Sequence, residues 1–200
     1  PARLASATKK LAALDPALAA MVARDGLPPM WVRPPGYATL IRIILEQQVT
    51  LASGAAAYRR LSEGVGRVTP GMVYQRSEAQ LRRLGLTRQK ARYCRELARA
   101  LIEGDLDLTS LSAMNAEAVR KAMMKVTGIG VWTSDIYLLT ALRHPDIWPR
   151  GDLALYQVMR QAFNRDDPPS KLDLLASRWR PWRSVAARIL WHHYLKTRGS

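Results

Sequence analysis

Apolar residues recur three and four positions apart along most of the chain, the spacing that aligns side chains on one face of an α-helix. One such face between residues 38 and 49 comprises Leu40, Ile41, Ile44, Leu45 and Val49. A second comprises Ala91, Cys94, Ala98 and Leu101, and arginine and lysine side chains line the opposite face of that segment. The sequence shows no pair of alternating strands joined by a hairpin turn. The pattern therefore predicts an all-α fold.

Start and stop signals divide the chain into these helices. Glycines and a proline predict a loop over residues 63–72. Ser77, with Gln80 three residues later, is typical of a capping box that opens a short helix. Asp152 stands directly before an apolar helical pattern that reaches about Phe163, so its carboxylate is expected to cap that helix.

The segment TGIG lies between two predicted helices, from Asn115 to about Val126 and from about Val131 to Leu142. Its glycines allow positive φ angles and leave room for the backbone amides at the start of the second helix to approach a phosphate. Such contacts hold a nucleic-acid backbone without reading its bases. A tight turn between two helices, with no ligand, is the alternative interpretation.

Composition and charge define the class of partner. The 200 residues make one domain or two small lobes, and 31 basic against 16 acidic residues give a net charge of +15 and a sequence pI near 10.7. A polyanion is the expected partner, nucleic acid first, with an affinity that falls steeply with salt. No apolar run approaches the roughly 18 residues that span a bilayer, and the N-terminal segment lacks a secretory-type apolar run, so we expect no membrane partner and a soluble, intracellular protein.

A single cysteine limits the metal and redox chemistry. Cys94 excludes an intramolecular disulfide, a four-cysteine zinc site and a four-cysteine iron–sulfur cluster. We expect its thiol to be a small buried hydrophobic group.

Four motifs carry a resemblance to a known family, and the first of them consists of two segments. TGIGVWTSD is followed about twenty residues later by WPRGD, and residues 44–61, 84–98 and 180–191 read ILEQQVTLASGAAAYRRL, LGLTRQKARYCRELA and RPWRSVAARILW. Together they resemble the HhH-GPD base-excision DNA glycosylases, in the alkyladenine branch of 3-methyladenine DNA glycosylase II. The resemblance covers most of residues 37–196. It implies a single helical glycosylase core over 1–200 without an N-terminal β domain, with one lobe at about 38–145 and a second at about 1–37 plus 146–200.

The resemblance also implies roles for individual residues at the reacting end. Asp152 matches the catalytic carboxylate, which stabilises an oxocarbenium-like sugar while a flipped nucleotide occupies a pocket between the lobes. The expected base pocket comprises Trp191, Trp132, Ile136 and Tyr137. Ile136 stands where the bacterial enzyme has an aromatic residue, so the pocket is expected to be wider there, and Tyr137 compensates only if its helix is rotated.

The same resemblance places DNA contacts on the hairpin and on the EQQVT segment. Gln48 matches the wedge that fills the gap left by the flipped nucleotide, although a polar wedge departs from the apolar one expected. The full set of expected DNA-binding residues is Gln47, Gln48, Gly128, Gly130 and Thr133. The family hairpin also holds Na⁺ or K⁺ through main-chain carbonyls, here those of Met124, Val126 and Ile129. No other cofactor is expected, and no iron–sulfur cluster.

These features predict a monofunctional glycosylase, because Trp132 replaces the lysine with which strand-cutting relatives form a Schiff base. The expected reaction is hydrolytic excision of 3-methyladenine and related N-alkylpurines from double-stranded DNA, leaving an abasic site. We expect a monomer in the bacterial cytoplasm at the nucleoid, or in the nucleus if the source is eukaryotic. Two alternatives stay open: a non-catalytic helix-hairpin-helix DNA-binding module, and a glycosylase for a different damaged base.

The remaining aromatic and histidine side chains are expected to be structural. The tryptophans concerned are Trp31, Trp148, Trp179 and Trp182. His192 and His193 follow Trp191 directly, but core or surface positions are commoner for histidine than catalytic ones.

Overall fold

The structure, a computed structural model, describes residues 2–198, and that range contains helices and no strand. The predicted all-α fold is confirmed. The helices gather in two compact units, one formed by Arg33–Leu142 and the other by the described residues on either side of it. Within the described residues, no helix combines the length and hydropathy needed to cross a bilayer.

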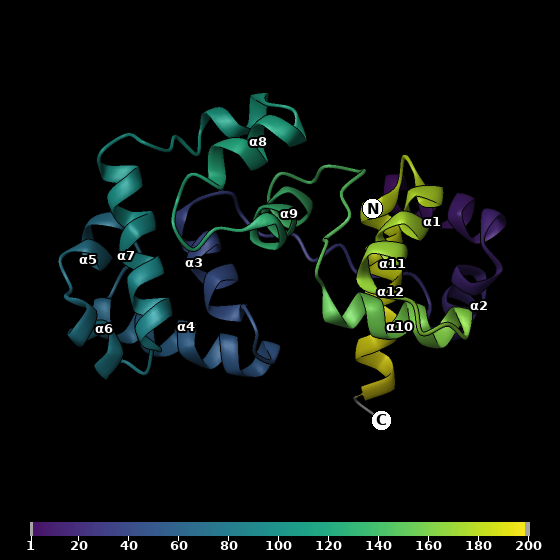
Figure 1. The fold of residues 1–200 in the computed structure, drawn as a ribbon, viewed down its shortest axis with the longest axis horizontal. Helices are drawn as coiled ribbons and strands as arrows, with labels where there is room; N and C mark the ends of the chain where they lie inside the picture. Colours follow the sequence, from purple (N-terminus) through teal and green to yellow (C-terminus); the bar gives the residue numbers. More distant parts are fainter. Residues whose placement is uncertain (1, 199–200) are drawn as a thin grey trace. The chain divides into compact units, whose positions relative to one another are not determined.

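The unit Arg33–Leu142 is built around helices α3 and α7, each of which packs against several others (Figure 1). Helix α7 packs against α5, α6 and α3, and α3 packs against α4 and α9. The elements are α3 (Tyr37–Glu46), α4 (Leu51–Val65), α5 (Pro70–Tyr74), α6 (Glu78–Arg83), α7 (Arg88–Ile102), the 3₁₀ helix η1 (Ser110–Ala113), α8 (Ala116–Met123) and α9 (Val131–Thr140). The capping box of Ser77 and Gln80 is confirmed at the start of α6. Cys94 is fully buried in α7, and burial raises the pKa of its thiol to about 12.

Two details of this unit differ from the sequence prediction. Val49 was expected on the apolar face of α3, but the helix ends at Glu46 and Val49 is 45% exposed. The predicted loop over 63–72 shrinks to the four residues between α4 and α5, because Gly64 continues α4. A Cβ atom there would lie 2.4 Å from Leu84 Cδ2, so this glycine serves close helix packing rather than a turn.

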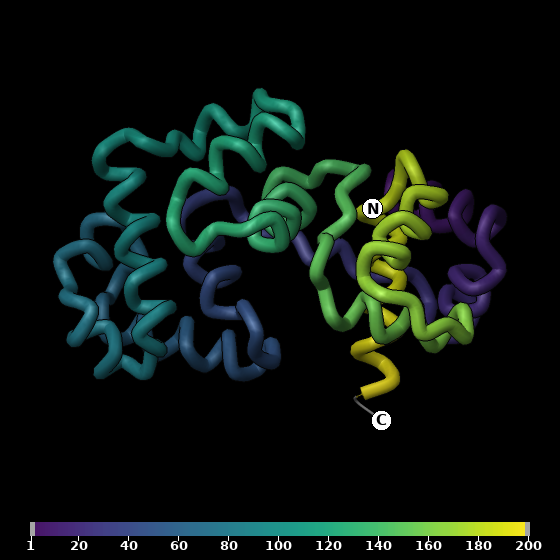
Figure 2. The backbone as a smooth tube through the Cα atoms, viewed as in Figure 1, coloured from purple at the N-terminus to yellow at the C-terminus, as the bar shows by residue number. Residues whose placement is uncertain are grey.

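The second unit joins the two ends of the sequence (Figure 2). Helix α12 packs against α1, α2 and α10, so N-terminal and C-terminal segments share one core. Its elements are α1 (Ala2–Leu14), α2 (Pro16–Asp25), α10 (Leu153–Phe163), α11 (Pro169–Leu175), the 3₁₀ helix η2 (Ala176–Trp179) and α12 (Arg183–Arg198). The segment Ser184–Leu190 of α12 is buried throughout.

A buried carboxylate ties this core together. Asp15 caps α2 by accepting from the amides of Ala17 and Leu18, and its Oδ2 accepts from Trp179 Nε1 at 2.7 Å and from Arg178. Trp179 is 1% exposed. Trp148 is also buried, so the structural role predicted for these two tryptophans is confirmed, whereas Trp31 and Trp182 are half-buried.

Candidate functional site

Asp152 forms the N-cap of α10. Its Oδ1 accepts a hydrogen bond from the amide of Leu155 at 3.1 Å, as the sequence predicted for a capping carboxylate. The residue is only 8% exposed, and Gly151 directly before it has φ +86°. A negatively charged side chain at this position is stabilised by the partial positive charge of the helix N-terminus.

The loop that leads to Asp152 is fixed by the first residues of α12. Ser184 Oγ donates to His144 O at 2.7 Å and accepts from Ile147 N at 2.9 Å. Arg183 holds the Asp146 carboxylate with Nε and Nη2 at 2.8 and 2.9 Å. Burial alone would raise the pKa of Asp146, but these hydrogen bonds outweigh it and lower the pKa. Arg183 and Ser184 of the 180–191 motif thus hold the loop.

Trp191 lies on α12 in the same unit as Asp152, and it is half-buried. Trp31 packs against it edge to face, with ring centroids 6.4 Å apart and an interplanar angle of 73°. Trp31 adopts φ +43°, a left-handed conformation that is uncommon for a bulky residue. The strained backbone therefore presents a second indole beside Trp191.

The two histidines after Trp191 bind the end of α2. His192 Nε2 lies 2.9 Å from Asp25 O, and His193 Nδ1 lies 2.6 Å from Asp25 Oδ2. Burial tends to raise the pKa of Asp25, but the hydrogen bonds from His193 and Arg24 outweigh it and lower the pKa. Both histidines consequently fix α12 on α2, which agrees with the structural role predicted for them.

The hairpin belongs to the other unit and joins α8 to α9. Gly128 has φ +95°, and a Cβ atom there would lie 2.2 Å from Cγ of Tyr93 on α7. Only glycine fits this turn, both for its conformation and for the approach of the tyrosine ring. Gly130 is the exposed N-cap of α9 and contributes no capping side chain.

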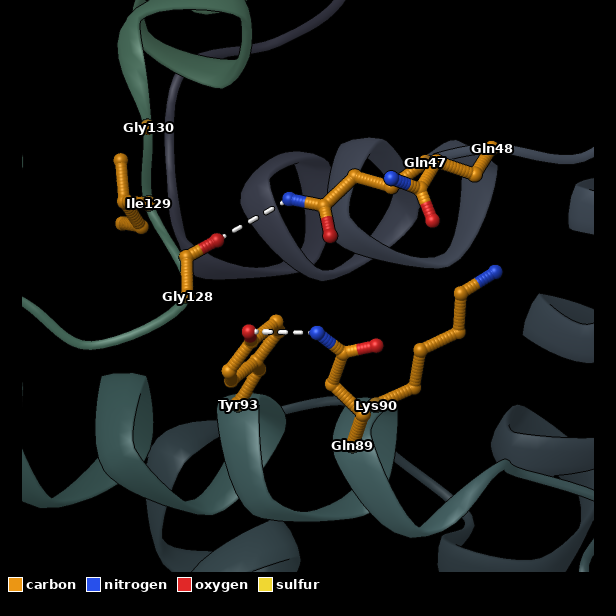
Figure 3. Close-up of a pocket in the computed structure, with 8 residues that line it drawn as sticks. All are labelled: Gln47, Gln48, Gln89, Lys90, Tyr93, Gly128, Ile129 and Gly130. Carbon is orange, nitrogen blue, oxygen red and sulfur yellow. Dashed lines mark hydrogen bonds between the residues drawn. The ribbon is translucent and has the colours of Figure 1, made fainter.

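Gln47 ties the end of α3 to this hairpin. Its Nε2 donates to Gly128 O at 3.0 Å and to Thr133 Oγ1 at 2.8 Å (Figure 3). Gln47 and Thr133 were both predicted to contact DNA, Thr133 through its backbone amide, and this stays a prediction. Their side chains are hydrogen-bonded to each other, and Thr133 is 2% exposed. Gln48 is exposed at φ +55°.

A polar hollow of about 360 Å³ lies beside the hairpin within this unit (Figure 3). It is lined by Gln47, Gln48, Gln89, Lys90, Tyr93, Gly128, Ile129 and Gly130. Lys90 Nζ donates to Leu45 O at 2.6 Å near the end of α3, and its partial burial lowers its pKa. The exposed Gln48 thus directly follows the C-terminal end of α3, which hydrogen bonds from Lys90 and Gln47 hold in place.

An ion pair fastens the two helices of the hairpin. Arg120 Nε on α8 lies 2.6 Å from Oδ1 of Asp135 on α9, whose side chain is fully buried. Helix α8 ends at Met123 and α9 at Thr140, both slightly before the predicted ends.

The other predicted pocket residues lie on α9. Trp132 is half-buried in its first turn and Ile136 is 6% exposed. Tyr137 is completely buried, and its hydroxyl accepts from Gly36 N at 3.0 Å. The structure thus gives Tyr137 a place in the core, where it holds the start of α3, instead of an open face toward a base.

The carbonyls expected to hold a cation come from the same turn. Val126 O accepts from Ile129 N at 3.1 Å and retains a second lone pair, and Met124 is 45% exposed. Neutral oxygen donors of this kind suit Na⁺ or K⁺, so Met124, Val126 and Ile129 fit such an ion chemically. Among residues 2–198, no three His, Cys, Asp or Glu side chains are grouped to hold a metal ion.

Sequence reasoning missed several residues that support the site. Tyr156, Asp173, Tyr93 and Arg120 were given no role, although Tyr156 stands one helical turn after Asp152. Their partners are distant along the chain, and only that helical spacing offered a signal.

Comparison with known proteins defines the family. Residues 41–184 match the HhH-GPD superfamily of base excision DNA repair proteins, and the chain belongs to this family. The putative DNA-3-methyladenine glycosylase YfjP of Bacillus subtilis is 30% identical over 165 residues, which cover 78% of this chain and 58% of that protein. DNA-3-methyladenine glycosylase 2 of Escherichia coli is 27% identical over 163 residues, covering 76% and 55%. The chain thus spans little more than half the length of these relatives.

Solved structures share the fold over nearly the whole chain. A DNA-3-methyladenine glycosidase from Bacillus halodurans superposes with a TM-score of 0.73 at 25% identity, covering 93% of this chain and 92% of that chain. The 3-methyladenine DNA glycosylase Mag1 of Schizosaccharomyces pombe, in complex with abasic DNA, gives a TM-score of 0.86 at 21% identity, covering 96% and 97%.

Proposed function

We propose that the protein is a monofunctional DNA glycosylase that hydrolyses the N-glycosidic bond of alkylated purines, 3-methyladenine among them, in double-stranded DNA. The observation that carries this proposal is the placement of Asp152. It combines the family's Gly-Asp motif with a fixed, nearly buried carboxylate at the start of α10. The 3-methyladenine glycosylases among its relatives support the substrate class.

The proposed reaction follows from the positive charge of the alkylated base and the negative charge of Asp152. An N-alkylated purine can carry a positive charge, so it leaves with the bonding electron pair and needs no strong general acid. The sugar left behind develops oxocarbenium character. The negative charge of Asp152 stabilises that character and assists attack by water at the anomeric carbon. The products are the free base and an abasic site.

The paired indoles of Trp191 and Trp31 supply recognition in this proposal. An electron-rich indole face attracts a cationic base more strongly than a neutral one, by a fraction of a kcal/mol to about 2 kcal/mol. Preference for damaged over normal bases would come from this cation–π attraction and from the fact that an alkylated base is a better leaving group than a normal one.

The hairpin holds the DNA backbone. The amides near Gly128 and Gly130 would bind phosphates without reading sequence. A Na⁺ or K⁺ held by the carbonyls of Met124, Val126 and Ile129 would add positive charge beside those phosphates. Gln48 would fill the gap left by the flipped nucleotide, since it is the exposed residue next to the anchored Gln47.

The test measures base release from methylated duplex DNA by the wild type and by Asp152→Asn. Asparagine caps helices as well as aspartate does, so the fold should persist while release falls by at least about a hundredfold. Asp166→Asn, a change at a fully exposed acid in the same unit, is the matched control and should release bases at the wild-type rate. Because Trp132 replaces lysine, borohydride added to the same reactions should trap no covalent enzyme–DNA adduct.

Two results would contradict the proposal in different ways. Equal release by the wild type and Asp152→Asn would show that Asp152 is not the catalytic residue. Tight duplex binding with no release from methylated DNA, nor from DNA with etheno, deaminated or oxidised bases, would instead support a binding module.

A further inference from the structure

The carboxylate of Asp173, in α11, receives two hydrogen bonds from residues that flank the loop before Asp152. Its Oδ1 accepts from Trp148 Nε1 at 2.9 Å and from the hydroxyl of Tyr156 at 2.7 Å. Trp148 begins the WPRGD segment, and Tyr156 lies one turn into α10. A single oxygen atom therefore binds both sides of the segment that carries Asp152.

Tyr156 passes this restraint to the residue next to Asp152. The Tyr156 hydroxyl accepts from the amide of Gly151 at 2.7 Å while it donates to Asp173. The Tyr156 amide also donates to Asp152 O at 3.1 Å as the first turn of α10 forms. The hydrogen bond from its amide thus fixes the left-handed backbone of Gly151, and this in turn fixes the position of Asp152, the next residue.

The three side chains are well placed to stay in this arrangement. Tyr156 is 2% exposed and Trp148 is 3% exposed, and the Trp148 ring packs on Trp179 at 5.6 Å between centroids. Burial, reinforced by the charge of Asp173, raises the pKa of the Tyr156 hydroxyl to about 12. The hydroxyl consequently remains a hydrogen-bond donor throughout the physiological range of pH.

We propose that Asp173, Tyr156 and Trp148 form a positioning network that sets the backbone at Gly151 and, through it, the carboxylate of Asp152. The inference rests on the proposed function, because it assigns these residues to the geometry of its reacting group. In this proposal they act through Gly151 and not by contact with base or sugar. Their effect is therefore on the rate of the chemical step and not on the affinity for DNA.

The experiment compares single-turnover release of alkylated bases from methylated duplex DNA with affinity for a duplex that contains an abasic site. Tyr156→Phe removes only the hydroxyl. It should lower the release rate roughly tenfold to hundredfold, as expected when a catalytic group is displaced by a fraction of an ångström to 1 Å, and leave the affinity within about twofold. Asp173→Ala should behave in the same way, and the double variant should be no slower than Asp173→Ala, since both changes break one network.

Two control variants separate positioning from general stability. Asp173→Asn keeps an oxygen acceptor for Tyr156 and Trp148, so it should restore most of the rate that Asp173→Ala loses. Tyr37→Phe deletes another buried hydroxyl, which donates to Cys94 O at 3.2 Å in the other unit, and should leave the rate unchanged. Thermal unfolding of each variant identifies any that fail to fold.

The outcomes distinguish failure of the positioning network from failure of the proposed function on which it rests. If the wild type releases base and Tyr156→Phe and Asp173→Ala release it equally fast, the positioning network is refuted and the proposed function stands. Asp173→Asn as slow as Asp173→Ala would also refute it, because the acceptor would not be what matters. If the wild type releases no base from methylated DNA, nor from DNA with etheno, deaminated or oxidised bases, the proposed function fails and the inference fails with it.

Discussion

Helices α9 and α10 begin in similar ways but are capped differently. Each follows a turn with a positive-φ glycine, Gly128 before α9 and Gly151 before α10. Helix α9 then starts at Gly130, which has no side chain to place at its N-terminus. Helix α10 starts at Asp152, whose carboxylate bonds the Leu155 amide. One end is available to an anion from outside the protein, whereas the other carries an anion of its own.

This difference shows how one local structure can serve two purposes. A helix N-terminus attracts negative charge, and the capping residue decides where that charge comes from. With glycine as the cap, a phosphate can occupy the position, which suits a backbone contact. With aspartate as the cap, the negative charge is fixed in the protein, which suits stabilisation of a developing cation.

The two helix starts are also held by different means. Without a capping side chain, α9 is fastened to α8 by the ion pair of Arg120 with the buried Asp135. The start of α10 is fixed by its own cap and by the Tyr156 and Asp173 hydrogen bonds. Substitutions can therefore weaken one start without touching the other.

The largest expected effect comes from Arg120→Ala. It withdraws the guanidinium from a fully buried carboxylate, a change that typically costs about 3–5 kcal/mol of unfolding free energy. Urea unfolding measures this cost, and duplex affinity should fall with it because the hairpin loses its fastening. Lys121→Ala, at an exposed neighbour on α8, should cost less than about 0.5 kcal/mol.

Asp135→Asn provides the second arm of that test. Added to Arg120→Ala, it removes the buried charge and should recover part of the lost stability. A cost below about 1 kcal/mol for Arg120→Ala alone would mean that packing, and not the ion pair, holds α8 to α9.

Gly130→Asp would give α9 the cap that α10 has. Gly130 is extended at φ −99°, and a Cβ atom there meets nothing within 4 Å, so the substitution fits. Unfolding free energy should stay within a few tenths of a kcal/mol or rise. Duplex affinity should fall roughly a hundredfold, because a carboxylate would stand where a phosphate is expected.

Gly130→Asn is the matched control, since it caps the helix without adding charge. Its affinity should lie well above that of the aspartate variant at low salt, and the gap should narrow as salt screens the charge. Equal affinities for the two variants would show that no phosphate approaches the start of α9.

Local signals in the sequence predicted the helix starts correctly. Contacts between residues far apart in the sequence could not be predicted from such signals. The caps at Ser77 and Asp152 depend on residues within one turn, so spacing alone indicates them. The role of Gly64 depends on Leu84, and that of Gln47 depends on Gly128, which no local pattern reveals.

The same limit applies to the candidate site. Local pattern singled out Asp152 as a helix cap and Gly128 and Gly130 as a turn that can approach a phosphate, and the resemblance added the catalytic role of Asp152. Tyr156 and Asp173 could not be singled out in this way, because their importance comes from hydrogen bonds that exist only once α10 and α11 have packed.

The smallest expected effect compares the two positive-φ glycines directly. Alanine at either position pays about 1–2 kcal/mol for a left-handed backbone. At Gly151 a Cβ atom meets nothing within 4 Å, whereas at Gly128 it meets the Tyr93 ring. Gly128→Ala should therefore cost about 1–3 kcal/mol more than Gly151→Ala in urea unfolding.

A double variant identifies the source of that excess. In a Tyr93→Gly background the ring and its Cβ atom, which would lie 2.7 Å from the new Cβ, are both gone. There, Gly128→Ala should cost no more than Gly151→Ala does in the wild type. Gly104→Ala, at φ +80° with open space around its Cβ position, calibrates the backbone cost alone. If the excess persisted without the ring, the hairpin turn would be constrained by its own backbone. The contact of Gly128 with Tyr93 on α7 would then result from the shape of the turn and would not determine that shape.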